Sequence, residues 1–358
     1  MAANFSFGNI TSPKRVEAFH KELISRDIAV YDIPIPRNVT DFPNIVRSYL
    51  MLRKLCYEKN YCLLHTQSPI GGVVSRLAAK KSRKKGMKVV YTAHGFHFFK
   101  GAAIFHWLFF YPVEKWLSAY TDTLITMNGE DYRRAKFFYA GQVCRLPGIG
   151  LHLEKYSADK KKRMQMRRKF GFKEHEFVIL SVGQLSRRKN QKTMIHAMAL
   201  LKETDARYVI AGLGECEKEY RKLISRLQLR QYVRLLGYWD DIPSLLQMAD
   251  CFAFPSLQEG LPVSLMEAMA AGVPIICSRI RGNRDLIRDK IDGIMLDPYD
   301  AAGYAHAIRQ FMNNHKLADD YRTQAGIRIR EFSAKRVNST MEKIYRQYLK
   351  SEQEENLL

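Results

Sequence analysis

Glu259 and Glu267 are the two side chains of this sequence whose type and spacing most directly suggest chemistry. Seven residues separate them in the Gly- and Pro-containing segment 255–274. The apolar run 251–254 predicts a strand, and Pro262 marks the start of a helix that has Glu267 in its early turns. Free N–H groups at a helix N-terminus favour a phosphate, and carboxylates suit sugar hydroxyls. The alternative is that Glu267 only complements the helix dipole and that Glu259 is solvated.

A basic turn is expected after the first strand of the C-terminal half. It covers residues 183–190, begins with Gly183 and contains Arg188 and Lys189. Open parallel sheets bind ligands outside the carboxyl ends of their strands, so these two cations are placed to neutralise a diphosphate. The simpler alternative is that a lysine in a loop is only solvated.

Glycine turns are expected after two further strands of the same half. Gly212 and Gly214 lack side chains and therefore permit a ligand to approach the backbone closely, although the pair is not a full G-x-G-x-x-G motif. Gly237 and Tyr238 follow a third expected strand. The tyrosine is either a ligand contact or a surface aromatic.

In the N-terminal half, two pairs of residues also follow expected strands. His94 stands at the carboxyl end of a buried-looking strand, and His97 is a weaker candidate in the same loop. Gly71 and Gly72 open a helix after another strand, where N–H groups can bind an anion. A structural histidine and a plain strand-to-helix turn are the alternatives.

These residues stand in motifs that resemble, in order, those of the retaining glycosyltransferases of family four, which have the GT-B fold. The matching motifs are the E-x7-E segment and residues 181–190, 209–215, 236–238 and 249–250. The resemblance covers about residues 28–345. It implies an α/β fold with two Rossmann-like domains that face each other across a cleft, a donor site in the second domain and an acceptor side in the first.

The resemblance also implies roles for individual residues. Glu259 would bind hydroxyls of the donor sugar as a catalytic residue, Glu267 would bind the nucleotide ribose, and Tyr238 would lie near the base. Gln184 stands where the family often has Arg, so the diphosphate clamp is assigned to Lys189 and Arg188. The full donor-binding set is Gly183, Arg188, Lys189, Gly212, Gly214, Gly237, Tyr238, Gly260, Leu261 and Glu267. The acceptor side comprises His94, with a catalytic role, and Gly71, Gly72 and His97.

The segment 91–116 is especially similar to bacterial exopolysaccharide and capsule enzymes of this family. The function that this implies is transfer of a hexose or N-acetylhexosamine from a UDP-sugar to a polyprenyl-diphosphate-linked glycan, with retention of configuration. No cofactor is expected. No metal is expected either, because the sequence has no D-x-D motif. A nucleotide-sugar epimerase of GT-B architecture and a catalytically silent binding protein are the alternatives.

The charge of the chain indicates an anionic partner. Its 58 Lys and Arg residues against 36 Asp and Glu residues give a net charge of +22, with basic clusters at 76–88 and 160–169. No nucleic-acid motif accompanies these clusters, so an anionic membrane surface is favoured. The aromatic segment 96–117 is too short and too interrupted to span a bilayer, but it suits the membrane interface, or alternatively the core. Scattered cysteines and the absence of a signal-like start predict a cytoplasmic protein, peripheral at the inner face of the membrane.

Strands alternate with helices along the chain, which predicts parallel sheets. The first sheet is expected from strands at 28–33, 61–65, 88–93, 123–127 and 142–146, and the second from 177–182, 208–211, 233–236, 251–254, 274–277 and 293–296. The expected domains are residues 1–150, a basic linker at 151–172, a donor-binding domain at 173–332 and, at 333–358, a C-terminal helix that returns to the first domain.

The first residues of the chain resemble the middle of the family pattern. Family members have a strand, a Gly-containing turn, a helix and most of a second strand before the point that matches residues 1–8. The N-terminal domain is therefore expected to lack this beginning. Either the first domain is defective, or the true start lies upstream of Met1, and the second alternative is favoured. A first domain without its central strand would be unstable.

Overall fold

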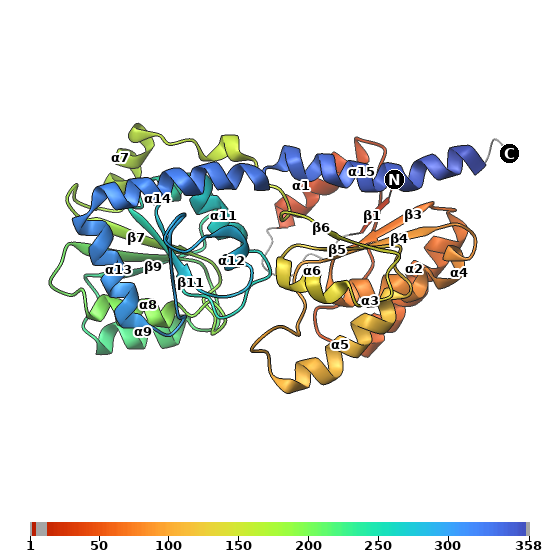
Figure 1. Ribbon diagram of the computed structural model, residues 1–358, viewed down its shortest axis with the longest axis horizontal. Coiled ribbons are helices and arrows are strands. Elements are labelled where there is room, and N and C mark those ends of the chain that lie inside the picture. The colour runs from red at the N-terminus through yellow and green to blue at the C-terminus, as the bar shows by residue number, and fades with distance from the viewer. Residues whose placement is uncertain (1, 5–12, 356–358) are drawn as a thin grey trace. The chain divides into compact units, whose positions relative to one another are not determined.

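The structure is a computed structural model that describes residues 2–4 and 13–355. The chain divides into two compact units (Figure 1). Unit 1 comprises Met1–Thr126, Asp131–Arg145 and Lys343–Leu358, and unit 2 comprises Met127–Glu130 and Leu146–Glu342. Each unit contains its own parallel sheets, which confirms the α/β fold class.

The strands of unit 1 form two sheets instead of the single expected one. Strands β3 (Leu63–Thr66), β4 (Lys88–Ala93), β5 (Thr123–Thr126) and β6 (Gln142–Arg145) form a parallel sheet in this order. Strand β2 (Ala29–Tyr31) pairs instead with β1 (Ala2–Asn4), a strand that was not expected from the sequence. Its register with β1 runs from Ala2–Ala29 to Asn4–Tyr31, so its hydrogen bonds go to the chain's first residues.

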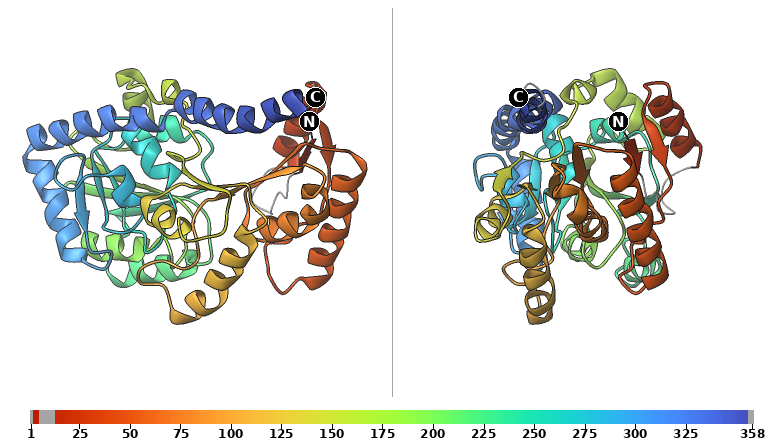
Figure 2. Two further views of the ribbon diagram at one scale, coloured as in Figure 1. Left: turned by 45° about the vertical axis from the view of Figure 1, so that its right-hand side comes forward. Right: turned by 90° about the vertical axis from the view of Figure 1, so that its right-hand side faces the viewer.

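Helices cover both sides of the β3–β6 sheet (Figures 1 and 2). On one side lie α2 (Phe42–Glu58), α3 (Pro69–Ala78), α4 (Lys80–Arg83) and α5 (Ile104–Ser118). On the other side lies α15 (Ala334–Glu355). Two further helices, α1 (Pro13–Ile24) and α6 (Gly129–Ala135), complete this part of the chain.

The sheet of unit 2 has six parallel strands in the order β12-β11-β10-β7-β8-β9. The strands are β7 (Phe177–Val182), β8 (Ala206–Ala211), β9 (Val233–Gly237), β10 (Cys251–Phe254), β11 (Ile275–Ser278) and β12 (Ile294–Leu296). From β7 the chain adds β8 and β9 on one side, and it then adds β10, β11 and β12 on the other side. The direction of strand order therefore reverses between the neighbours β7 and β10. In doubly wound sheets such a reversal creates the crevice where ligands bind.

Two hydrophobic clusters lie on the two faces of this sheet. Alternate residues of β7 divide between them, with Val178 and Leu180 in one and Ile179 in the other. The helices that bury the sheet are α8 (Gln191–Ala199), α9 (Glu217–Arg226), α10 (Ile242–Gln247), α11 (Val263–Ala270), α12 (Asn283–Leu286), α13 (Ala301–Asn313) and α14 (His315–Arg328), with the 3-10 turn η2 (Ile329–Phe332) before α15.

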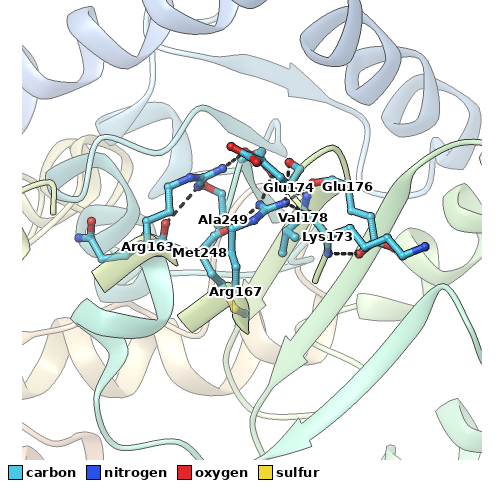
Figure 3. A network of polar contacts seen from close by, with 10 residues as sticks. Arg163, Arg167, Lys173, Glu174, Glu176, Val178, Met248 and Ala249 are labelled. Atoms are coloured by element: carbon cyan, nitrogen blue, oxygen red, sulfur yellow. Dashed lines mark hydrogen bonds and ion pairs between the residues drawn. The ribbon is translucent and has the colours of Figure 1, made fainter. Parts of the chain in front are cut away.

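The stretch 151–172, interpreted from the sequence as a basic linker, is folded into unit 2. It contains the 3-10 turn η1 (Leu153–Tyr156) and helix α7 (Lys160–Lys169). Arg163 and Arg167 of α7 donate to the carbonyl oxygens of Ala249 and Met248, respectively (Figure 3). Both arginines also pair with the carboxylate of Asp250. Part of this basic run therefore holds the helix to the sheet and is not a solvated face.

Asp250 explains the Ala-Asp motif recognised at 249–250. Its carboxylate also accepts a hydrogen bond of 2.7 Å from the N–H of Val178, at the start of β7. Arg167 is almost fully buried and donates to backbone carbonyls of Lys173 and Glu176. The motif is thus a structural connection among α7, β7 and the start of β10.

The last helix, α15, starts in unit 2 and belongs to unit 1 from Lys343 onward. There it contacts the β3–β6 sheet through two hydroxyls. Tyr345 bonds His65 Nδ1 at 2.7 Å, while His65 Nε2 lies 2.8 Å from Thr92 Oγ1. Tyr348 bonds Thr123 Oγ1 at 2.5 Å. Burial lowers the pKa of His65 to about 4, so its imidazole is neutral in this contact at pH 7.

The expected absence of the family's first strand, turn and helix stays a prediction. Residues 2–4 form β1, whereas residues 5–12 of the segment on which the expectation rests lie outside the described residues. None of the helices in the described part of the chain is both long enough and apolar enough to cross a bilayer.

Candidate functional site

The loops after β7 and β10 meet at the reversal of strand order in unit 2. Lys189 Nζ lies 2.8 Å from Glu259 Oε1, and an Nη1 of Arg188 lies 2.9 Å from the same oxygen. The N–H of Leu257 donates to the carbonyl of Arg188 at 2.8 Å, which joins the two loops through their backbones. The structure therefore brings together three of the residues selected from the sequence.

The charges of this cluster are partly withdrawn from water. Only 8% of the Glu259 side chain and 12% of the Lys189 side chain are exposed, against 43% of the Arg188 side chain. Burial lowers the pKa of Lys189, the neighbouring Glu259 carboxylate opposes this, and Arg188 adds to it. The ammonium also lies 4.6 Å from the centre of the Phe254 ring. Two cations against one carboxylate leave a net positive charge at the crevice, which suits an anion.

The glycines of the predicted turns shape the backbone beneath this cluster. A Cβ on Gly212, whose φ is +153°, would stand 2.0 Å from the carbonyl oxygen of Gly183, and one on Gly214 would stand 2.2 Å from that of Leu185. The N–H of Gly212 donates to Gly237 at 2.8 Å. The turns after β7, β8 and β9 are thus packed backbone against backbone, an approach that only glycine allows.

Glu267 lies in α11, which begins at Val263 directly after Pro262, as predicted. Its Oε1 accepts a hydrogen bond of 2.7 Å from the hydroxyl of Tyr156 in η1. Burial raises the pKa of Glu267, and the bond from Tyr156 opposes that rise. Tyr156 was missed because it lies in the stretch interpreted as a linker, where no periodic pattern pointed inward.

Arg281 and Gly282 also belong to this site and were not selected from the sequence. Nε of Arg281 donates to the carbonyl of Glu259 at 3.2 Å, and a Cβ on Gly282 would stand 2.5 Å from the carbonyl oxygen of Gly260. They follow β11, the neighbour of β10. The rule that drew attention to the other post-strand turns would have found them too.

The remaining predicted donor residues lie on the same carboxyl-end side of the sheet. Leu261 follows Gly260 and lies against Gly148, where an added Cβ would stand 2.9 Å from the leucine Cδ2. Tyr238 follows the edge strand β9 and is 52% exposed. Gly237 has a φ of +72°, a left-handed conformation that favours glycine.

In unit 1, His94 lies at the surface after β4, with Nε2 3.2 Å from Gln67 Oε1. Partial desolvation lowers its pKa, so the imidazole is neutral at pH 7 and can both donate and accept a hydrogen bond. The ring of His97 instead stacks on Phe110 at 4.7 Å. The structure thus gives His97 a packing contact.

The two glycines selected from unit 1 have local structural partners. The N–H of Gly71 donates to the Oγ of Ser68, which caps α3, at 3.1 Å. A Cβ on Gly72 would stand 2.6 Å from the Tyr91 ring, so this glycine lets α3 pack against β4. Their assignment to the acceptor side stays a prediction.

Comparison with known proteins relates this geometry to a family. Residues 162–327 match the model described as "Glycosyl transferases group 1", and residues 9–128 match "Glycosyl transferase 4-like". The chain is 40% identical over 324 residues to "Putative glycosyltransferase EpsD" of Bacillus subtilis, a match that covers 89% of this chain and 85% of the relative.

A second relative has a more specific name. The chain is 30% identical over 277 residues to "UDP-Gal:alpha-D-GlcNAc-diphosphoundecaprenol alpha-1,3-galactosyltransferase" of Escherichia coli, which covers 74% of this chain and 69% of the relative. Among solved structures, Anabaena HepE in complex with UDP and glucose superposes with a TM-score of 0.79 at 19% sequence identity, covering 97% of this chain and 91% of HepE. The likeness to HepE shows the GT-B fold. The sequence matches go further, and the chain belongs to the glycosyltransferases.

Proposed function

We propose that this protein transfers a hexose or N-acetylhexosamine from a UDP-sugar to a polyprenyl-diphosphate-linked glycan, with retention and without a metal, in exopolysaccharide or capsule synthesis. The observation that carries the proposal is the convergence of Lys189, Arg188 and Glu259 at the reversal point of the unit 2 sheet. The name of the Escherichia coli relative contains both a UDP-sugar donor and a diphosphoundecaprenol-linked acceptor. UDP and glucose in the HepE complex support the same donor class.

The chemistry of the cluster fits this donor. Lys189 and Arg188 bind the diphosphate and stabilise the negative charge that develops on it as the glycosidic bond breaks. Glu259, fixed by those cations and by the backbone contacts of its loop, accepts hydrogen bonds from sugar hydroxyls near the reacting carbon. Glu267, held by Tyr156, accepts those of the ribose. The packed glycine turns let the nucleotide approach the backbone.

The acceptor chemistry is assigned to unit 1. His94 is the residue proposed to contact the acceptor, since its neutral imidazole lies at the carboxyl end of β4 and serves as donor or acceptor of a hydrogen bond. In a front-face reaction the leaving phosphate takes the proton of the attacking hydroxyl, and the new bond forms on the face that the nucleotide leaves. A separate catalytic base is then not required. Within the described residues, no group of three or more His, Cys, Asp or Glu side chains is arranged to hold a metal ion.

A polyprenyl-linked acceptor confines the reaction to a membrane surface. We therefore place the protein at the inner face of the cytoplasmic membrane, bound peripherally. The net charge of +22 favours an anionic surface.

The test is transfer of label from a panel of nucleotide sugars to membranes or to a purified polyprenyl-diphosphate-linked sugar. We expect transfer from one UDP-sugar that depends on the acceptor and persists in EDTA, and nuclear magnetic resonance of the product should show retained anomeric configuration. Conversion of the UDP-sugar without acceptor would indicate an epimerase. UDP binding without turnover of any donor would indicate a catalytically silent binding protein, and a requirement restored by Mn²⁺ would contradict the metal-free mechanism.

A further inference from the structure

Helix α5 exposes a continuous apolar face along its length. Phe105, Phe109 and Trp116 recur at helical spacing and are 62%, 51% and 52% exposed, while Ile104 and Leu108 beside them are 73% and 71% exposed. In both views of Figure 2 the gold helix at the bottom is α5, and its first turns extend below the rest of unit 1. The opposite side of the helix faces the protein and includes the fully buried Leu117.

This face is bordered by lysines. Lys100 is exposed just before the helix, and Lys115 within it lies over the exposed ring of Tyr139 at 5.3 Å. Lys80 lies 5.1 Å from the centre of the Tyr120 ring, which in turn packs edge-on against Trp116. Cations therefore flank the apolar face at both ends.

No exposed carboxylate of this segment opposes these lysines. Glu114 is the only acidic residue between positions 94 and 121, and it turns inward. Its Oε2 lies 3.0 Å from Arg76, which is fully buried beneath the Tyr91 ring. Aromatic and aliphatic side chains with flanking lysines and no free acid are the composition of a helix that lies in the interface of an anionic membrane.

The contacts of two arginines change the interpretation of the basic cluster at 76–88 as a lipid-binding surface. Arg76 is inside the protein, and Arg83 forms a two-pronged pair with Asp122 at 2.9 and 3.1 Å. These two arginines stabilise unit 1 and are not available to lipid. Lys80, Lys81, Lys84 and Lys85 of the same cluster are exposed, and Lys80 lies beside the face defined by α5.

We propose that α5 binds an anionic bilayer, with Ile104, Phe105, Leu108, Phe109 and Trp116 inserted among the headgroups and acyl chains. The inference rests on the proposed function, because a polyprenyl-linked acceptor is reached at such a surface. At 1.5 Å per residue a 15-residue helix is about 22 Å long, so α5 lies along the interface and does not cross it. A second copy of this chain is the less suitable partner, because a two-fold contact would bring the same lysines together.

The experiment is flotation of the protein with vesicles of phosphatidylcholine alone or mixed with phosphatidylglycerol. We expect the protein to float with the anionic vesicles and to be released by high salt. The double variant Phe105→Ser/Phe109→Ser should bind at least about tenfold more weakly, since two aromatic anchors are lost. The matched control Tyr299→Ser/Ile327→Ser removes two exposed apolar side chains of unit 2 and should bind as the parent does.

Unaltered vesicle binding by the Phe105/Phe109 variant would overturn the proposal. So would a parent protein that is dimeric in solution and becomes monomeric in this variant, because a second copy would then occupy the face. The melting temperature and the UDP affinity measured without lipid should be the same in the variant as in the parent protein. These two measurements test whether the variant is folded. If α5 binds vesicles but no UDP-sugar is transferred to any lipid acceptor, the proposed function fails while this inference stands.

Discussion

The post-strand loops of unit 2 and unit 1 contain similar residue types, but the structure uses them differently. In unit 2 the turns after neighbouring strands contact one another: Gly212 approaches the carbonyl of Gly183, and Lys189 reaches Glu259. In unit 1 two of the selected residues pack against neighbouring elements instead, Gly72 against the Tyr91 ring of β4 and His97 against the Phe110 ring of α5.

A glycine or a histidine after a strand must therefore be interpreted from its contacts. Where the turns of adjacent strands share backbone contacts, their side chains are fixed relative to one another and can act on one ligand. Where a glycine only makes room for a neighbouring ring, its role is in packing and it is not evidence of a ligand site. By this criterion His94, which lies at the surface beside Gln67, is the strongest of the four candidates in unit 1.

The strongest loss of activity is expected from a change at the centre of the unit 2 cluster. Glu259→Gln should lower kcat about 10³-fold, or ~4 kcal/mol of transition-state stabilisation, because the carboxylate is proposed to contact the sugar and also pairs with Lys189 and Arg188. Transfer rates with saturating UDP-sugar measure this. Glu203→Gln, which changes an exposed glutamate of the same unit, is the control. Near-normal turnover in the Glu259 variant would remove this residue from catalysis.

The second prediction tests Lys189, which with Arg188 is proposed to bind the diphosphate. Lys189→Ala should reduce kcat/KM by at least about 30-fold, roughly 2 kcal/mol, since a largely buried cation that is proposed to bind the leaving diphosphate is lost. Steady-state kinetics with varied donor measure the change. Lys192→Ala is the control, because Lys192 is exposed and pairs with Glu219 outside the cluster. An equal loss in both variants would point to a general effect of positive charge.

The third prediction separates packing glycines from site glycines. Gly72→Ala should lower the free energy of unfolding by about 1–3 kcal/mol, because the new methyl group overlaps the Tyr91 ring. The UDP affinity of the folded protein should not change. Thermal denaturation and calorimetric titration with UDP measure the two quantities, with Gly326→Ala, which meets no atom within 4 Å, as control. Weaker UDP binding by the Gly72 variant would contradict the interpretation that Gly72 of unit 1 serves only in packing.

The smallest effect is expected at Tyr156. Tyr156→Phe should weaken UDP binding about threefold to tenfold at pH 7, because Glu267 loses the hydroxyl that orients it. That hydrogen bond also opposes the rise in the pKa of Glu267 caused by burial, so its removal raises the pKa further. The carboxylate then takes up its proton at a higher pH, and the affinity of the variant begins to fall earlier as the pH decreases.

Calorimetric titration with UDP between about pH 5 and 8 tests this expectation. Tyr299→Phe, a change at an exposed tyrosine, serves as the control. Identical pH profiles for the parent protein and the Tyr156 variant would show that Tyr156 does not position Glu267.

Much of the fold was predictable because buried parallel strands are short apolar runs. The expected strands at 88–93, 177–182 and 251–254 coincide with β4, β7 and β10. The pairing of β2 with β1 was not predictable in this way, since hydrophobic periodicity does not specify a partner. Helix α7 was missed because its sequence is mostly basic. Only Met166 joins the hydrophobic core, and the hydrogen bonds to the neighbouring strand and helix are made by Arg163 and Arg167.

For the site, post-strand position located the residues that meet at the sheet reversal. It located Lys189 and Glu259 but could not distinguish a functional residue from a packing residue. Only the three-dimensional contacts of Gly72 and His97 show that both have partners in the packing of unit 1. Likewise, only burial shows that Arg76, counted from the sequence as part of a surface cluster, lies inside the protein.

The membership of Lys343–Leu358 in unit 1 has a consequence for the order of events during synthesis. His65 and Thr123 leave the ribosome early, whereas their partners Tyr345 and Tyr348 follow only after all of unit 2. At about 5–20 residues per second, the interval between Arg145 and Tyr345 lasts about 10–40 s. Unit 2 can fold in that time, while one side of the β3–β6 sheet is not yet covered by α15. A nascent chain that stops before Tyr345 leaves that side of the sheet open to other unfinished proteins or to a chaperone.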